Sequence, residues 1–91
     1  MDDLLATFLP RFRAIASERL ARLARLRAES DRETAQRELH ALAGEAGVLG
    51  LQDVATLARS AEARWVAGNW STPEEWTAAL AALSDAIGTA R

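Results

Sequence analysis

The hydrophobic residues of this chain recur every three or four positions along most of its length, which is the spacing of amphipathic helices. Breaks in the pattern occur at Pro10, over residues 29–32, at Gly50 and over residues 68–73. The stretches between the breaks predict four principal helices. Within the first stretch, Pro10 either kinks one helix or separates a short N-terminal helix from a longer one. The residues expected on its core-facing side are Phe8, Phe12, Ile15, Ala16, Leu23 and Leu26.

The later helices carry end signals in the sequence. Asp31 is a candidate N-cap for a second helix that runs to about Leu49, and Gly50 can adopt the left-handed conformation that ends it. A third helix is expected over residues 51–68. The run 72–75, Thr-Pro-Glu-Glu, combines an N-cap, a proline at the first helical position and a capping-box glutamate. It therefore predicts the start of a fourth helix.

Short connections between successive amphipathic helices favour antiparallel neighbours. The sequence therefore predicts an all-α fold, an up-down antiparallel four-helix bundle formed by a single domain over residues 1–91. We expect Trp65 and Trp76 to anchor the core. The other residues expected to be mostly buried are Leu39, Leu42, Leu49, Val54, Ala58, Leu80, Leu83 and Ile87.

Composition narrows the possible functions. The chain has no cysteine, which excludes disulfides, thiolate zinc sites and a cysteine nucleophile. The net charge is −2 and charges of both signs are interleaved, which argues against nucleic acid as a partner. The sequence contains no Ser/His/Asp set, phosphate-binding loop, metal-ligand spacing or paired catalytic carboxylates. We therefore expect no metal, no cofactor and no independent catalytic activity.

The apolar runs are short. None approaches the roughly 18 residues that a membrane span needs. The segment Met1–Leu5 has two aspartates where a signal peptide carries positive charge. We therefore expect no membrane association and a cytoplasmic location.

The second helix has a further stripe that faces away from its apolar side. At about 100° per residue, this stripe lies roughly 120° to 200° from the core direction and so faces water. It consists of Glu33, Arg37, His40, Gly44 and Gly47, and His40 is the only histidine of the chain. A glycine inside a helix costs about 0.5 to 1 kcal/mol relative to alanine. Helix stability therefore does not explain a glycine at position 44. A reason outside the helix is that the lack of a side chain there leaves the imidazole of His40 open to a partner.

His40 and Arg37 together suit chemistry with an anion. An exposed imidazole is substantially neutral, and therefore nucleophilic, at physiological pH. Arg37 lies one turn before His40 and can offset the charge of an anion attached to the ring. These are the requirements of a phosphoryl acceptor.

The run 40–51, His-Ala-Leu-Ala-Gly-Glu-Ala-Gly-Val-Leu-Gly-Leu, resembles the signature of the histidine-containing phosphotransfer (HPt) domain family. In that family the histidine is followed two positions later by leucine, four positions later by glycine, and then by a small-residue segment that ends in Leu-Gly. The positions that fit are Leu42, Gly44, Leu49 and Gly50, with Leu57 and Glu62 continuing the pattern on the third helix.

One position departs from the pattern of the family. The family usually has a lysine directly before the glycine, and this chain has Ala43 there, so a positive side chain that assists phosphate binding is absent. Arg37 is the first candidate to replace it, and Arg59 on the third helix is the second. Gly47 either faces the partner or belongs only to the end of the helix.

The resemblance implies a phosphocarrier and not an enzyme. The aspartyl phosphate of a receiver domain, or a sensor or hybrid histidine kinase, would supply a phosphoryl group to Nε2 of His40, and another receiver domain would take it. Mg²⁺ would belong to the receiver, and this chain would act as a monomer without a cofactor of its own.

Three other interpretations stay open. An HPt-like bundle that is never phosphorylated could inhibit or scaffold a kinase or response regulator, which the alanine at position 43 supports. A helical oligomerisation module would leave a long hydrophobic stripe uncovered. A nucleic-acid role depends on the arginine-rich first helix and would require one continuous basic face.

Overall fold

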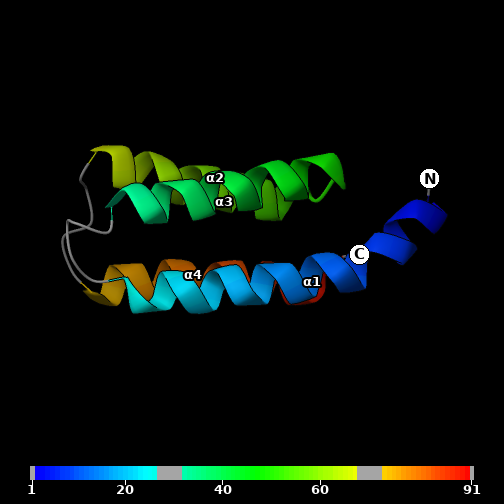
Figure 1. Ribbon diagram of the computed structural model, residues 1–91, viewed down its shortest axis with the longest axis horizontal. Coiled ribbons are helices and arrows are strands. Elements are labelled where there is room, and N and C mark those ends of the chain that lie inside the picture. The colour runs from blue at the N-terminus through cyan, green and yellow to red at the C-terminus, as the bar shows by residue number, and fades with distance from the viewer. Residues whose placement is uncertain (1, 27–31, 68–72, 91) are drawn as a thin grey trace.

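Four helices make up the described part of the chain (Figure 1). The computed structural model describes residues 2–26, 32–67 and 73–90, and no strand occurs within these ranges. Among the described residues, α2 contacts α1 and α3, α4 contacts the same two helices, and α2 and α4 are diagonally opposite. The structure is thus the predicted up-down four-helix bundle. The helices are α1 (Asp2–Arg25), α2 (Arg32–Val48), α3 (Gln52–Ala67) and α4 (Pro73–Thr89).

The first helix is continuous through Pro10, so no separate N-terminal helix precedes it in residues 2–25. Its first turns extend past the ends of the other three helices (Figure 1). Neither α1 nor any other helix of the described ranges combines the length and the apolar character needed to cross a membrane. The proposed N-caps Asp31 and Thr72 lie outside the described residues.

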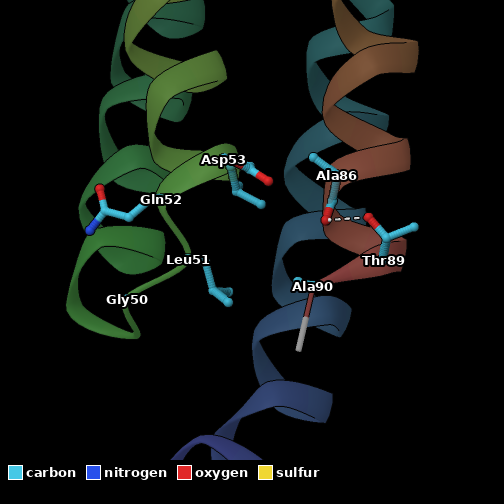
Figure 2. Close-up of a pocket in the computed structure, with 8 residues that line it drawn as sticks. Gly50, Leu51, Gln52, Asp53, Ala86, Thr89 and Ala90 are labelled. Carbon is cyan, nitrogen blue, oxygen red and sulfur yellow. Dashed lines mark hydrogen bonds between the residues drawn. The ribbon is translucent and has the colours of Figure 1, made fainter.

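The turn between α2 and α3 confirms the role predicted for Gly50. This glycine has a φ of 75°, a left-handed conformation that only glycine adopts at little cost. The amide of Leu51 donates to the carbonyl of Ala46 at 2.8 Å, and the amide of Gly50 donates to that of Gly47 at 3.1 Å. These two bonds are the Schellman motif that terminates helices. The buried Leu51 then points from the turn toward the last turn of α4 (Figure 2).

The core contains apolar residues from all four helices. Leu49 and Leu80, expected to be mostly buried, are only partly so and pack against its edge. Trp76 is buried and Trp65 is half-buried, and their rings meet edge to face with centroids 5.1 Å apart. The indole Nε1 of Trp76 donates to the carbonyl oxygen of Leu23 at 3.1 Å. The remaining core predictions are confirmed, since Leu39, Leu42, Val54, Ala58, Leu83 and Ile87 are all buried.

Two residues expected on the core side of α1 are instead exposed, so the prediction was wrong for Phe8 and Ile15. Phe12, Ala16 and Leu23 mark the centre of the buried stripe. Phe8 and Ile15 lie about 60° to 80° from that centre, at the margin of the buried stripe. Periodicity predicts burial for every apolar residue on this side of α1. The helix contacts only α2 and α4, so the stripe that it buries is narrower than the stripe that its apolar residues form.

Ion pairs connect α1 to α2 along this same margin. Arg19 contacts Glu38 at 3.1 Å and Glu45 at 2.7 Å, and Arg22 contacts Glu38 at 3.0 Å. The hydrogen bond from Arg19 to Glu45 is the main cause of the raised pKa of Arg19, which stays charged. Burial opposes the ionisation of Glu38, but its hydrogen bonds from Arg22 and Arg19 outweigh burial and lower the pKa of Glu38.

Candidate functional site

His40 lies on the outer face of α2, with its side chain 80% exposed. Leu39 and Leu42, which flank it in the sequence, are fully buried and fix the rotation of α2 about its axis. The exposure predicted from the helical stripe is therefore confirmed.

A carboxylate from α3 contacts the imidazole. Nδ1 of His40 lies 3.1 Å from Oε2 of Glu62 and 3.3 Å from Oε1. The Glu62 side chain is only 19% exposed, so its neighbours restrict its position. Because an ionised carboxylate can only accept hydrogen bonds, this contact favours the neutral tautomer that carries its proton on Nδ1. That tautomer has its lone pair on Nε2, on an exposed ring.

A shallow groove opens beside His40. Glu33, Gln36 and Arg37 from α2, together with Glu62 from α3, line it with the imidazole. The Arg37 side chain is exposed and makes no hydrogen bond or ion pair within the described ranges, so its guanidinium is available to an anion. No three His, Cys, Asp or Glu side chains come together as a metal site in the described part of the chain.

Gly44 and Gly47 lie on the C-terminal side of His40. A Cβ atom at Gly44 would meet nothing within 4 Å, so packing inside the bundle gives no reason for a glycine there. A Cβ atom at Gly47 would lie 3.6 Å from Nη2 of Arg59, an ordinary contact. Gly47 is two turns from His40, about 10 Å along the helix. The Arg59 guanidinium thus lies beside Gly47 and not beside the imidazole.

Ala43, at the position of the family lysine, is only 4% exposed. It belongs to the core where α2 packs on α3, the most extensive helix contact of the described residues. A long charged side chain at this position would have to leave the helix interface along its length to reach water. The small residue therefore fits the close approach of α2 and α3, and the nearest exposed cation on α2 is Arg37.

Sequence reasoning did not identify two residues of this site. Glu62 was noted only as part of a family pattern, and Gln36 was not noted at all. A signal for Glu62 was available, because positions equally far from a tight turn face each other in an antiparallel helix pair. His40 lies ten residues before Gly50 and Glu62 lies twelve after it, so the two are nearly level.

This chain has an exposed histidine on one face of an up-down bundle, and a carboxylate contacts the imidazole. These features place it in the class of histidine-bearing four-helix modules. The family model described as Hpt domain matches residues 7–86, and the chain belongs to this family. Hpt domains act in phosphotransfer in two-component signalling and are phosphocarrier modules without a catalytic domain of their own. No curated protein and no solved structure gives a significant match to the chain.

Proposed function

We propose that this chain is a histidine phosphotransfer protein of a two-component phosphorelay. It accepts a phosphoryl group on Nε2 of His40 from the aspartyl phosphate of a receiver domain, or from a sensor or hybrid histidine kinase, and passes the group to another receiver domain. The observation that carries this proposal is the hydrogen bond from Nδ1 of His40 to Glu62, because it leaves Nε2 unprotonated on an exposed ring.

The transfer needs no proton to move. In the accepting step, the lone pair of Nε2 attacks phosphorus in line with the bond to the receiver's aspartate. The N–P bond forms while the P–O bond breaks, and the aspartate leaves as a carboxylate. The ring keeps its proton on Nδ1 and becomes an imidazolium that carries the phosphoryl group. In the passing step, the carboxylate of another receiver attacks phosphorus and the neutral imidazole leaves.

Glu62 supports this chemistry in two ways. Its hydrogen bond to Nδ1 sets the tautomer and fixes the ring, so that Nε2 is oriented before a partner arrives. Its negative charge also stabilises the positive ring of the phosphorylated state more than the neutral ring of the starting state. Glu62 is therefore a positioning residue that also favours the product of the accepting step.

Arg37 is the residue of this chain best suited to the phosphoryl oxygens. It lines the same groove as His40, and its guanidinium can donate to two oxygens at once. Mg²⁺, bound by the receiver domain, would neutralise further charge on the transferring group. The chain itself, a monomer in the cytoplasm in this proposal, contributes the nucleophile and its orientation.

A second function is favoured by Ala43. The alanine leaves the C-terminal side of His40 without the cation that the family usually has, as expected of a bundle that binds and inhibits or scaffolds a kinase or response regulator without being phosphorylated. Such a protein would bind a charged receiver domain but acquire no label.

Incubation with receiver domains charged by acetyl phosphate tests the two functions. We expect acid-labile phosphate on the wild-type chain and none on His40→Gln. The variant should bind the receiver and melt like the wild type, because a solvent-facing side chain contributes little to stability. If the wild type binds a charged receiver without acquiring label, and His40→Gln binds equally well, the carrier proposal fails and the scaffold takes its place.

A further inference from the structure

The groove beside His40 carries more negative than positive charge. Two of the described residues that line it have carboxylates, Glu33 from α2 and Glu62 from α3. One of them, Arg37, has a guanidinium, and Gln36 is uncharged. Two negative groups against one positive group give the groove a net charge of −1 while the imidazole is neutral. The imidazole is neutral when Nε2 attacks phosphorus, so a phosphoryl group enters a groove of its own sign.

Glu33 contributes to this charge without touching the imidazole. It lies seven residues before His40, which is two helical turns or about 10 Å along α2. Glu33 is exposed and makes no hydrogen bond or ion pair in the described part of the chain. No direct partner among those residues therefore offsets its charge.

The C-terminal side of His40 does not restore the balance. Ala43, where the family usually has a lysine, is buried and uncharged. The guanidinium of Arg59 lies beside Gly47, two turns away, and Arg59 does not line the groove. The excess of negative charge at the N-terminal side of the imidazole therefore remains.

The position of Glu33 in its helix has a structural role that the control must share. A carboxylate in the first turn of a helix interacts favourably with the helix dipole, and Glu33 is in the first turn of α2. Glu74 is in the first turn of α4, is exposed, and makes no hydrogen bond or ion pair among the described residues. Because α4 is diagonally opposite α2, Glu74 matches Glu33 in everything except its position relative to His40.

The groove affects free and protein-bound phosphoryl donors differently. Free acyl phosphates are dianions at neutral pH, so a groove of net negative charge repels them. A receiver domain presents its aspartyl phosphate together with Mg²⁺, which neutralises charge on the transferring group. The groove therefore raises the barrier for a free donor more than for a receiver.

We propose that the charge of this groove selects against free anionic phosphoryl donors and that Glu33 is the specificity-determining residue. The inference rests on the proposed function. The disfavoured class is the free acyl phosphates, such as acetyl phosphate. In their reaction the N–P bond would form at Nε2 while the P–O bond breaks and acetate leaves, so only the charge of the donor differs from that of a receiver. His40 thus takes its phosphoryl group from a protein that neutralises the group.

The test compares three donors on the wild type, on Glu33→Gln and on the control Glu74→Gln. Acetyl phosphate is a dianion, and phosphoramidate, whose nitrogen is protonated, is a small monoanion. Both report the reactivity of His40 without the docking of a protein. The third donor is a receiver domain, charged with acetyl phosphate and then separated from it. Second-order rates are measured at about 0.01 M and about 0.5 M salt, and thermal melts verify that each variant is folded.

We expect Glu33→Gln to accelerate labelling by acetyl phosphate about threefold at the lower salt, the effect of one charge on a dianion about 10 Å away in water. Labelling by phosphoramidate should rise less, because this donor has a single charge. Transfer from the receiver should also change less than labelling by acetyl phosphate. The gain should disappear at the higher salt, where the Debye length is shorter than the distance. Glu74→Gln should remain close to the wild type with every donor.

Equal rates with acetyl phosphate in the wild type and Glu33→Gln at the lower salt would overturn the charge selection and leave the carrier function intact. A gain of the same size with both small donors, or at both salt concentrations, would contradict it as well, because such a gain does not depend on charge. The same conclusion follows if acetyl phosphate labels none of the proteins at the higher salt, where the repulsion is screened. A wild type that phosphoramidate labels and no receiver does would instead overturn the proposed function itself.

Discussion

Nδ1 of His40 and Oε2 of Glu62 lie 3.1 Å apart although the two residues are separated by 22 positions in the chain. The pair joins the exposed face of α2 to α3 and favours the tautomer with its proton on Nδ1, which leaves Nε2 for the proposed transfer. Every step proposed for the transfer depends on this assignment, because only an unprotonated Nε2 can attack phosphorus.

Substitution of Glu62 separates its charge from its hydrogen bond. The amide oxygen of Glu62→Gln can still accept from Nδ1, but it lacks the charge that stabilises the phosphorylated ring. Because charge-assisted hydrogen bonds exceed neutral ones by about 1 kcal/mol, we expect phosphoryl acceptance to slow roughly five- to tenfold in Glu62→Gln. Glu62→Ala, which loses both contributions, should be slower again.

Nitrogen NMR of the imidazole checks the tautomer directly, since His40 is the only histidine of the chain. The wild type and Glu62→Gln should favour the proton on Nδ1, and Glu62→Ala should shift toward the mixture seen in free imidazoles. If the tautomer populations of wild type and Glu62→Ala are the same, Glu62 does not position the ring.

Arg37 is predicted to matter for transfer more than for docking. Its removal in Arg37→Ala takes away a charge-assisted contact to the phosphoryl oxygens, worth about 1.5 to 3 kcal/mol, so transfer should slow by at least about tenfold. Arg37→Lys should restore part of the rate, because it keeps the charge but not the planar fork.

The matched control for Arg37 is Arg59→Ala, whose guanidinium lies against Gly47. Rates for each variant are measured with a charged receiver, and affinity with the uncharged receiver. A larger loss of transfer in Arg59→Ala than in Arg37→Ala would reverse the assignment and make Arg59 the replacement for the missing lysine.

The fold could be predicted from the sequence because the spacing of apolar residues identifies the buried face of each helix. Leu39 and Leu42 repeat with the helical period, and Gly50 has the one backbone conformation that ends α2. The exposure of His40 could be predicted from the same helical spacing, since a residue on the side opposite the buried stripe faces water.

The features that could not be predicted from the sequence depend on how the helices pack against one another. The contact of Glu62 with His40 depends on the register of α3 against α2, which no single helix encodes. The burial of Ala43 depends on how closely α3 approaches, and the exposure of Ile15 depends on which neighbours α1 has. Periodicity describes one helix at a time, so it assigned these three positions incompletely or wrongly.

The core position Leu83 tests whether α4 is docked as described. Its side chain is 1% exposed, so Leu83→Ala removes buried methyl groups and leaves a cavity at a cost of about 2 to 5 kcal/mol. Leu80→Ala, one turn earlier and only partly buried, should cost less. Urea denaturation of both variants checks this order, and an unchanged midpoint for Leu83→Ala would show that α4 does not pack on the core.

The ion pairs of Glu38 predict how stability responds to acid. The pKa of Glu38 is lower in the folded chain than its ordinary value of 4.5, so folding favours the ionised carboxylate. This contribution is present above pH 4.5 and is lost as the pH falls through the lowered value, when Arg22 loses its charged partner and Arg19 loses one of its two, Glu38. Glu38→Gln should therefore be less stable than the wild type at pH 7, by about 1 kcal/mol.

The difference between wild type and Glu38→Gln should shrink as the pH falls below 4.5. Unfolding free energies measured from pH 7 to pH 3 provide the test. Glu18→Gln, at an exposed α1 position without an ion pair in the described ranges, serves as the control and should follow the wild-type curve. A constant difference across this range would mean that the pairs with Arg19 and Arg22 do not favour the ionised form.

Substitutions of Gly44 should raise the stability of the folded chain and lower the rate of transfer from the receiver. A Cβ atom there meets nothing within 4 Å, so Gly44→Ala should fit without strain and stabilise the chain by about 0.5 to 1 kcal/mol, the difference in helix propensity. Gly44→Leu should stabilise it to a similar degree. The leucine side chain, however, stands between the imidazole and an approaching receiver, so transfer from the receiver should fall strongly while alanine has a smaller effect.

Thermal melts and receiver transfer rates for the two Gly44 variants, with phosphoramidate labelling as the reference, separate these effects. Phosphoramidate is small enough to reach Nε2 past a leucine, so its rate should remain near that of the wild type in both variants. Two side chains of different size are compared because Gly44 could instead be needed only for the flexibility of α2. In that case alanine and leucine would slow transfer equally, and they would do so with both the receiver and phosphoramidate. A loss that grows from alanine to leucine with the receiver alone requires a surface that closes over position 44.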